Sequence, residues 1–203
     1  MIRSGTQVTG DIINSSRKLR IIGRAGVGVD NVDVKAATQK GVLVVNSPGG
    51  NTIAAAEHTI AMMLALSRNI PIANSSTFQG KWERKKFVGN ELFKKKLGVV
   101  GLGKIGTHVA KVANALGMDV YGYDPFVSSE RAQQLQVRLS ELKTLFEESD
   151  YVTLHLPRTS ETENLVDMKV LKSMKKNAKL INCARGGITV SYTHLRAHET
   201  TDN

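Results

Sequence analysis

Short apolar runs alternate with amphipathic stretches along most of this chain. The clearest case begins with the apolar run at residues 97–100, which is short enough for a buried strand. A glycine-rich turn occupies residues 101–106, and the stretch from 105 to 116 repeats its apolar positions with the period of a helix. A second apolar run follows at 119–123. This order predicts a strand, a turn, a helix and a second, parallel strand.

The same alternation extends in both directions from this unit. Further strands are expected near residues 19–23, 42–45, 151–155 and 178–182. Further helices are expected near residues 34–40, 52–68, 71–80, 129–134, 141–147 and 167–174. Strands and helices that alternate at such short spacing favour a parallel sheet with helices on both faces. The predicted fold class is therefore α/β, with a Rossmann-type doubly wound parallel sheet.

The glycine turn carries the chemistry expected of a dinucleotide site. Gly101 allows the tight turn, Gly103 lets the backbone approach a pyrophosphate, and Gly106 lets the helix pack closely on the strand. The amino end of the helix would offer N–H groups and a partial positive charge to that pyrophosphate. Asp124 ends the second strand 23 positions after Gly101, near the spacing of an acid that binds a ribose 2′-hydroxyl. This acid favours NAD over NADP, because a 2′-phosphate would face a carboxylate.

Ligands of such sheets bind at the carboxyl ends of the strands, so the residues after each strand are candidates for chemistry. Arg185 is followed by two glycines. Its guanidinium could hold a carboxylate in a bidentate fork beside a bound nicotinamide, and the alternative is an ordinary surface arginine. His155 could shuttle a proton or pack at its strand end, and packing is favoured. Cys183 is interpreted as a small buried side chain, since no His–Asp arrangement surrounds it.

Two loops and one helix leave alternatives open. The loop after the first strand contains Gly26 and Gly28, which suit either a plain turn or backbone amides that converge on an anion. Residues 46–51 are turn formers and predict a hinge. The helix expected at 52–68 is apolar almost all round, which favours burial between layers or against another subunit. His58 in this helix is interpreted as packed or interfacial rather than as a metal ligand.

Composition narrows the class of protein. Hydrophobic residues make up 41% of the 203 and aromatic residues 5%, as expected for a soluble α/β core of Val, Ile, Leu and Ala. No run of ~18 apolar residues is present, so no membrane span is expected. The single cysteine excludes an internal disulfide and fits a reducing compartment, so the expected location is the cytoplasm.

The net charge of +10 is concentrated in two runs. Residues 81–96 contain seven basic and two acidic side chains, and residues 169–179 contain five lysines and no acid. Such runs are most often solvated surface, and the alternative is attraction of an anionic substrate or cofactor. A nucleic-acid partner is not expected, because few aromatic residues interleave the first run and none interleaves the second.

The alternation stops near residue 190. Residues 190–203 have no apolar period suited to a further helix, and they resemble translated adapter or vector sequence. We therefore expect a non-native tail here and exclude it from the fold. His194 and His198 are four residues apart, the spacing of a metal-binding pair on a helix. No third ligand is in view, so no metal site is predicted.

Six segments together resemble the D-isomer-specific 2-hydroxyacid dehydrogenase family. They cover residues 23–31, 46–51, 80–87, 101–106, 122–125 and 182–187, the last with the sequence Asn-Cys-Ala-Arg-Gly-Gly. The resemblance extends over residues 1–188. The basic run that contains Trp82 favours the branch of the family that acts on a phosphorylated 2-hydroxy acid.

This resemblance implies two domains and an NAD cofactor. Residues 1–47 would be part of an α/β substrate-binding domain whose N-terminal part is missing, and residues 48–188 an NAD-binding Rossmann domain incomplete at its C-terminus. The substrate contacts would come from Arg3, Arg24 and Asn51. The positions that match dinucleotide contacts of the family are Val27, Gly101, Gly103, Lys104, Ile105, Gly106, Asp124, Leu156, Cys183, Ala184 and Arg185. Relatives often carry threonine at the positions of Val27 and Leu156, so a hydroxyl contact is lost there.

The resemblance also implies an oxidoreductase that forms a homodimer or a higher homo-oligomer and acts on a small phosphorylated 2-hydroxy acid. Arg185 is the catalytic residue that this chain contains. The general acid–base histidine of the family and its glutamate partner lie downstream of the Cys-Ala-Arg-Gly-Gly motif, so we expect the chain as written to be inactive. Two alternatives stay open: a family member that acts on glyoxylate, hydroxypyruvate or D-lactate, and a non-catalytic NAD-sensing corepressor. No nucleic-acid or membrane partner is expected.

Overall fold

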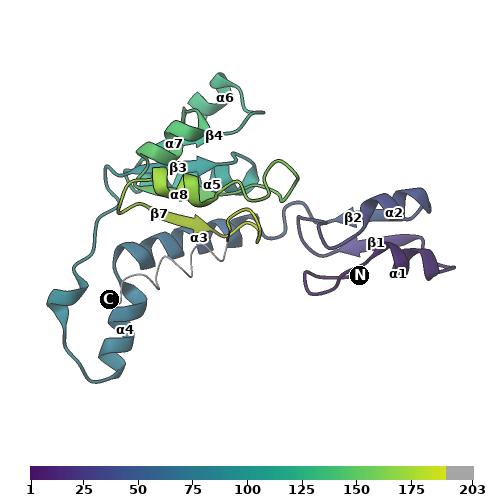
Figure 1. Ribbon diagram of the computed structural model, residues 1–203, viewed down its shortest axis with the longest axis horizontal. Helices are drawn as coiled ribbons and strands as arrows, with labels where there is room; N and C mark the ends of the chain where they lie inside the picture. Colours follow the sequence, from purple (N-terminus) through teal and green to yellow (C-terminus); the bar gives the residue numbers. More distant parts are fainter. Residues whose placement is uncertain (191–203) are drawn as a thin grey trace. The chain divides into compact units, whose positions relative to one another are not determined.

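The computed structural model describes residues 1–190, which divide into two compact units after Thr52 (Figure 1). The boundary predicted after residue 47 falls inside the first unit, and the assignment of the two units to substrate and cofactor remains a prediction. The expected tail at residues 190–203, with His194 and His198, lies outside the described residues from 191 on.

The first unit is built on two short parallel strands. Strand β1 (Ile21–Arg24) pairs with β2 (Leu43–Asn46), in the register that aligns the first residues of both strands and the last residues of both. Helices α1 (Gly10–Ser15) and α2 (Val34–Gln39) pack over them, and each begins at a side-chain cap, the Thr9 hydroxyl and the Asp33 carboxylate. The small core gathers Ile13, Ile22, Ala37 and Val42, with Val8, Val32 and Ala36 around them.

The second unit begins with helices and continues as an alternating sheet. Helices α3 (Thr52–Ser67) and α4 (Ile70–Phe78) and the short 3-10 helix η1 (Arg84–Phe87) come first. The five strands lie in the order β5 (Arg138–Leu139), β4 (Asp119–Tyr123), β3 (Lys96–Val100), β6 (Tyr151–Leu154) and β7 (Lys179–Asn182). The helices between them are α5 (Lys104–Ala115), α6 (Ser129–Gln134), α7 (Leu142–Glu148) and α8 (Met168–Ser173).

All four strand pairs of this sheet are parallel, so the predicted α/β fold with a Rossmann-type sheet is confirmed. The chain adds β4 and β5 on one side of β3 and then returns to add β6 and β7 on the other side. The carboxyl ends of β3 and β6 therefore flank the point where the strand order reverses, which is where such sheets bind ligands.

Apolar side chains of the strands point to both faces of the sheet and belong to two separate hydrophobic clusters. Leu97 and Val99 of β3 belong to a cluster with residues of α3 and α5, whereas Val100 belongs to a cluster with residues of α7. Helices thus cover both faces of the sheet, as the near-continuous apolar character of these strands predicts. In the described part of the chain, no helix combines the length and hydropathy needed to cross a membrane.

Three elements escaped prediction because their sequence signals are weak. Helix α1, the 3-10 helix η1 and strand β5 span six, four and two residues, too few to show a periodic pattern. Both residues of β5 are exposed. Strand β5 owes its existence to its pairing with Tyr121 and Gly122 of β4. Helix α4 carries its proline in the first turn, as predicted from Pro71.

Candidate dinucleotide-binding site

The glycine turn joins β3 to both of its neighbours at Gly101. The N–H of this residue donates to Tyr123 O of β4 (2.8 Å), and its φ is +93°. A Cβ at this position would lie 2.7 Å from His155 O and 2.9 Å from Leu156 Cδ2, at the end of β6. Glycine is therefore required both by the backbone conformation and by the close approach of β6.

Gly106 brings α5 against the turn. A Cβ at Gly106 would collide with Gly101 O and lie 3.0 Å from the carbonyl carbon of the same residue. The neighbouring Ile105 packs partly against the apolar cluster under α5, and Lys104 is the first residue of that helix. The third glycine of the motif thus permits the helix–strand contact that its position predicts.

Gly103 differs from the other two glycines of the turn, because nothing in the protein requires it. No described heavy atom lies within 4 Å of the position that its Cβ would take, and its φ of −65° is open to any residue. It forms the N-cap of α5, which has no side-chain cap and no acidic residue in its first turn. The open space beside an uncapped helix N-terminus fits the pyrophosphate of a dinucleotide.

Asp124 is fixed by two backbone amides. Its Oδ2 accepts from Leu102 N–H in the glycine turn (2.8 Å), and its Oδ1 accepts from Phe126 N–H (2.9 Å). An ionised carboxylate has about four acceptor sites, so two remain for other donors such as ribose hydroxyls. The contact with Leu102 ties the acid to the turn that would hold the pyrophosphate, which sequence spacing alone does not show.

The end of β6 contains a neutral histidine. The backbone N–H of His155 donates to Val100 O (2.8 Å). Its ring nitrogen Nε2 lies 3.0 Å from the hydroxyl of the fully buried Thr153. Burial lowers the pKa of His155 from its ordinary value near 6.5 to about 4. These contacts favour the packing interpretation of His155 over a proton shuttle.

The loop after β7 is organised by Asn182, a residue to which the sequence analysis gave no role. Its Oδ1 accepts from Ala184 N–H (3.1 Å), and its Nδ2 donates to Arg185 O (2.9 Å) and to the Thr189 hydroxyl (3.3 Å). An asparagine directly before a glycine-containing loop is a known signal for such an Asx turn. Arg185 is partly buried, and its Nη1 donates to Ala184 O (2.8 Å).

Parallel pairing brings these strand ends to one edge of the sheet. The glycine turn, Asp124, Leu156 and the loop that contains Arg185 follow β3, β4, β6 and β7, which are neighbours.

Cys183 is a free thiol that packs against the apolar cluster under α5. It is only partly buried, whereas the sequence predicted a buried side chain. Among residues 1–190, no group of three or more His, Cys, Asp or Glu side chains could hold a metal ion.

The remaining candidates lie in the first unit. Arg24 ends β1, and Ile2 forms a parallel bridge to it, which places Arg3 on the neighbouring segment. The Asn31 side chain donates to Arg3 O (2.9 Å) and to Thr6 O (2.6 Å), and so holds that segment. Val27 lies in the loop after β1, and Asn51 is exposed in the turn that precedes α3.

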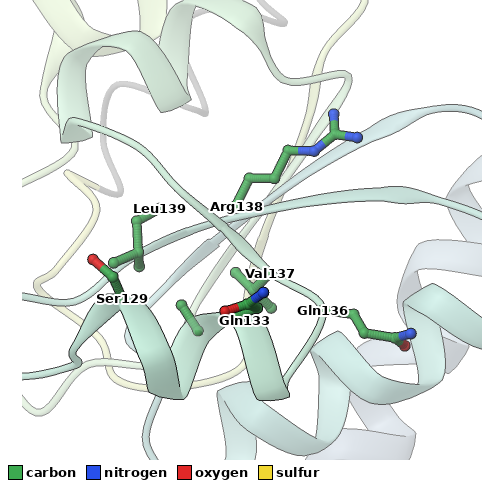
Figure 2. Close-up of a pocket in the computed structure, with 7 residues that line it drawn as sticks. Ser129, Gln133, Gln136, Val137, Arg138 and Leu139 are labelled. Atoms are coloured by element: carbon green, nitrogen blue, oxygen red, sulfur yellow. The ribbon is translucent and has the colours of Figure 1, made fainter.

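A separate pocket of about 440 Å³ lies between α6 and β5 (Figure 2). Its lining consists of Ser129, Ala132, Gln133, Gln136, Val137, Arg138 and Leu139. None of the predicted site residues lines it, and its one charged side chain, Arg138, donates to the Tyr121 hydroxyl (3.1 Å). We therefore place the candidate site at the glycine turn and the strand ends.

Known proteins resemble this chain in sequence and in fold. Residues 60–199 match the family described as D-isomer specific 2-hydroxyacid dehydrogenase, NAD binding domain. The D-3-phosphoglycerate dehydrogenase of Synechocystis is 58% identical over 200 residues, which are 98% of this chain and 36% of that protein. The enzyme of the same name from Bacillus subtilis is 47% identical over 98% of this chain and 38% of its own length. The chain thus spans little more than a third of the length of these relatives.

Solved structures support the fold and the cofactor. The D-lactate dehydrogenase of Aquifex aeolicus, complexed with NAD and lactic acid, superposes with a TM-score of 0.88 at 30% identity. The match covers 95% of this chain and 58% of that one. The predicted family and the predicted NAD cofactor are both confirmed by these matches.

Replacement of Gly103 by alanine separates cofactor binding from folding. The methyl group meets open space in the protein, so the free energy of unfolding in urea should stay within about 0.5 kcal/mol of the wild type. The same methyl group would stand where the pyrophosphate approaches, so the NADH affinity in a fluorescence titration should fall by about tenfold or more. Gly5→Ala is the matched control, since its surroundings are equally open. Unchanged NADH affinity in Gly103→Ala would contradict the site.

Proposed function

Because the chain belongs to the D-isomer specific 2-hydroxyacid dehydrogenase family, we propose that the enzyme to which this sequence belongs oxidises D-3-phosphoglycerate to 3-phosphohydroxypyruvate with NAD. This reaction is the first step of phosphorylated serine biosynthesis. The observation that carries the proposal is the identity of 47–58% to proteins named for this activity, over nearly the whole chain. The geometry of the glycine turn and Asp124 supports the choice of cofactor.

In the proposed reaction, a base removes the proton of the C2 hydroxyl as hydride leaves C2. NAD, when bound, supplies the hydride acceptor. Arg185 would hold the substrate carboxylate and align C2, with its backbone already fixed by Asn182. Arg3 and Arg24 would receive the phosphate, for which a guanidinium offers paired donors. Asn51 would add a polar contact. His155 is not assigned as the base, because its ring is engaged with Thr153.

A family member with another substrate is the nearest rival. The D-lactate dehydrogenase above shares the fold but only 30% identity, well below that of the phosphoglycerate enzymes. Two arginines on neighbouring segments of the first unit also suit a phosphate group, which lactate lacks. A non-catalytic NAD-sensing corepressor would keep the glycine turn but would not need these arginines.

We also propose that the protein self-associates through α3 and α4. One side of α3 is buried on the sheet through Ala56, Ile60 and Met63. Other positions of α3, and α4, expose large apolar side chains, namely Ile53, Met62, Leu64, Leu66, Ile70, Ile72 and Phe78. His58 is exposed on α3 rather than packed, so of its two expected settings only the interfacial one is open to it. Exposed apolar side chains on two consecutive helices favour a protein–protein interface.

Binding of matched hydroxy acids tests the proposed substrate. In the presence of NADH, isothermal titration should give D-3-phosphoglycerate an affinity at least about tenfold above that of D-glycerate, which lacks only the phosphate. D-lactate should bind no better than D-glycerate. Equal affinities for the three acids would support a rival substrate, and NADH binding without any hydroxy-acid binding would support the corepressor.

Variants of Asp124 test the cofactor preference. Asp124→Ala should lower the ratio of NADH to NADPH affinity by about tenfold, because the variant loses both the ribose contact and the repulsion of a 2′-phosphate. It also frees Leu102 N–H. Asp124→Asn is the matched control, since its one remaining oxygen can still accept from Leu102 N–H. It should lower the ratio through loss of charge alone. A ratio that neither variant changes would rule out this role of Asp124.

Sedimentation velocity tests the proposed self-association. The wild-type chain should sediment as a dimer or larger species at micromolar concentration, and Phe78→Glu should shift it toward the monomer, because a charge cannot be buried in an apolar contact without a partner. Phe126→Glu is the control, since Phe126 is 95% exposed but lies outside α3 and α4. A monomeric wild type, or equal effects of the two substitutions, would contradict the assignment of this surface.

A further inference from the structure

The guanidinium of Arg24 lies directly over Gly26. A Cβ at Gly26 would coincide with Arg24 Nη1 and would lie 2.7 Å from its Cζ and 3.5 Å from its Nε. No methyl group fits in that space beside the guanidinium. The φ of Gly26 is +154°, a conformation that residues with side chains rarely adopt. The side chain of Arg24 therefore occupies the volume that any other residue at position 26 would fill.

The backbone around Gly26 is held from both sides. Gly26 N–H donates to Arg24 O (3.0 Å), and Gly26 O accepts from Ser47 N–H (3.0 Å) at the end of β2. The Asn46 side chain donates to Val27 O (2.6 Å). Since three hydrogen bonds fix this loop, a substituent at position 26 cannot be relieved by a shift of the backbone without breaking some of them.

Shape, rather than hydrogen bonding, holds the inner part of the Arg24 side chain. Its Nε is buried and has no hydrogen-bond partner in the described part of the chain. A buried donor without a partner is uncommon in folded proteins and calls for an explanation. Here the guanidinium stem is packed against the backbone of the loop, so its direction depends on the absence of a side chain at Gly26.

We infer that Gly26 is a positioning residue that directs the Arg24 guanidinium toward the anionic group of the substrate. The inference rests on the proposed function, in which Arg24 binds D-3-phosphoglycerate. Alanine at position 26 would displace the guanidinium from its slot, so the substrate would lose a charge-assisted hydrogen bond. Apart from Val27, the predicted dinucleotide contacts belong to the second unit, so NADH affinity should change much less than substrate affinity.

Two measurements on the whole chain test this inference. First, the Arg24 Nε–H of the wild type should exchange slowly with solvent in ¹⁵N-resolved NMR spectra, and Gly26→Ala should make it exchange faster, as Nε becomes exposed. Second, Gly26→Ala should weaken D-3-phosphoglycerate binding by about tenfold, close to the effect of Arg24→Ala, and should change NADH affinity by less than about twofold.

A double-mutant cycle separates the loss of the arginine contact from a general disturbance of the loop. If Gly26 acts through Arg24, then Gly26→Ala in the Arg24→Ala background should change D-3-phosphoglycerate affinity by less than about twofold. Gly41→Ala is the matched control, because Gly41 also has a positive φ (+70°) but has nothing within 4 Å of its Cβ position. It carries backbone strain without a displaced arginine, and should leave both affinities unchanged.

The outcomes distinguish the inference from the proposed function. Additive effects in the cycle, or an unchanged exchange rate of Arg24 Nε–H in Gly26→Ala, would overturn the inference. If the wild-type chain binds no D-3-phosphoglycerate, the proposed substrate is wrong, and the exchange rate alone then decides whether Gly26 positions Arg24. Should Gly26→Ala unfold, as judged by circular dichroism, while Arg24→Ala/Gly26→Ala folds, the collision with Arg24 is supported directly.

Discussion

The contact between the glycine turn and the end of β6 is the constraint on which the candidate site depends. The N–H of Gly101 donates a hydrogen bond to Tyr123 O, and a side chain at Gly101 would have no room beside His155 O. Gly106 brings the first turn of α5 against Gly101. A side chain at either glycine would push the amino end of α5 away from the strands. The place where an anion can meet the uncapped helix is therefore fixed by two positions that lack a side chain.

The electrostatic character of the candidate site follows from this geometry. The Asp124 carboxylate is oriented by amides of the turn and of its own loop, so its free acceptor sites need no reorganisation when a ribose arrives. His155 adds no positive charge at neutral pH, because burial lowers its pKa to about 4. Attraction for the pyrophosphate would come from the backbone amides and the dipole of α5, together with the charge of Lys104 at the start of that helix. The amides and the dipole do not titrate with pH.

The sequence predicts those parts of the fold and site that follow from local pattern. The β3–α5–β4 unit shows the hydrophobic periods of its strands and its helix and contains three glycines with distinct structural roles. Asp124 follows the first of these glycines at the spacing expected of a ribose-binding acid. The sequence could not predict β5, which forms only because β4 offers it an edge. It also missed the task of Asn182, whose hydrogen bonds close a loop onto Arg185 and Thr189. Such roles depend on the path of the backbone after the strand, which no periodic pattern records.

In both units, an asparagine side chain holds the backbone next to a candidate arginine. In each, the side chain of an asparagine that ends a strand donates to a backbone carbonyl near an arginine: Asn46 donates to Val27 O, shortly after Arg24, and Asn182 donates to Arg185 O. The asparagine thus holds the loop backbone beside the arginine. The conformational entropy of that backbone is lost on folding, before a ligand arrives. An anion that binds beside either loop would therefore order less of the chain on binding, which favours its affinity.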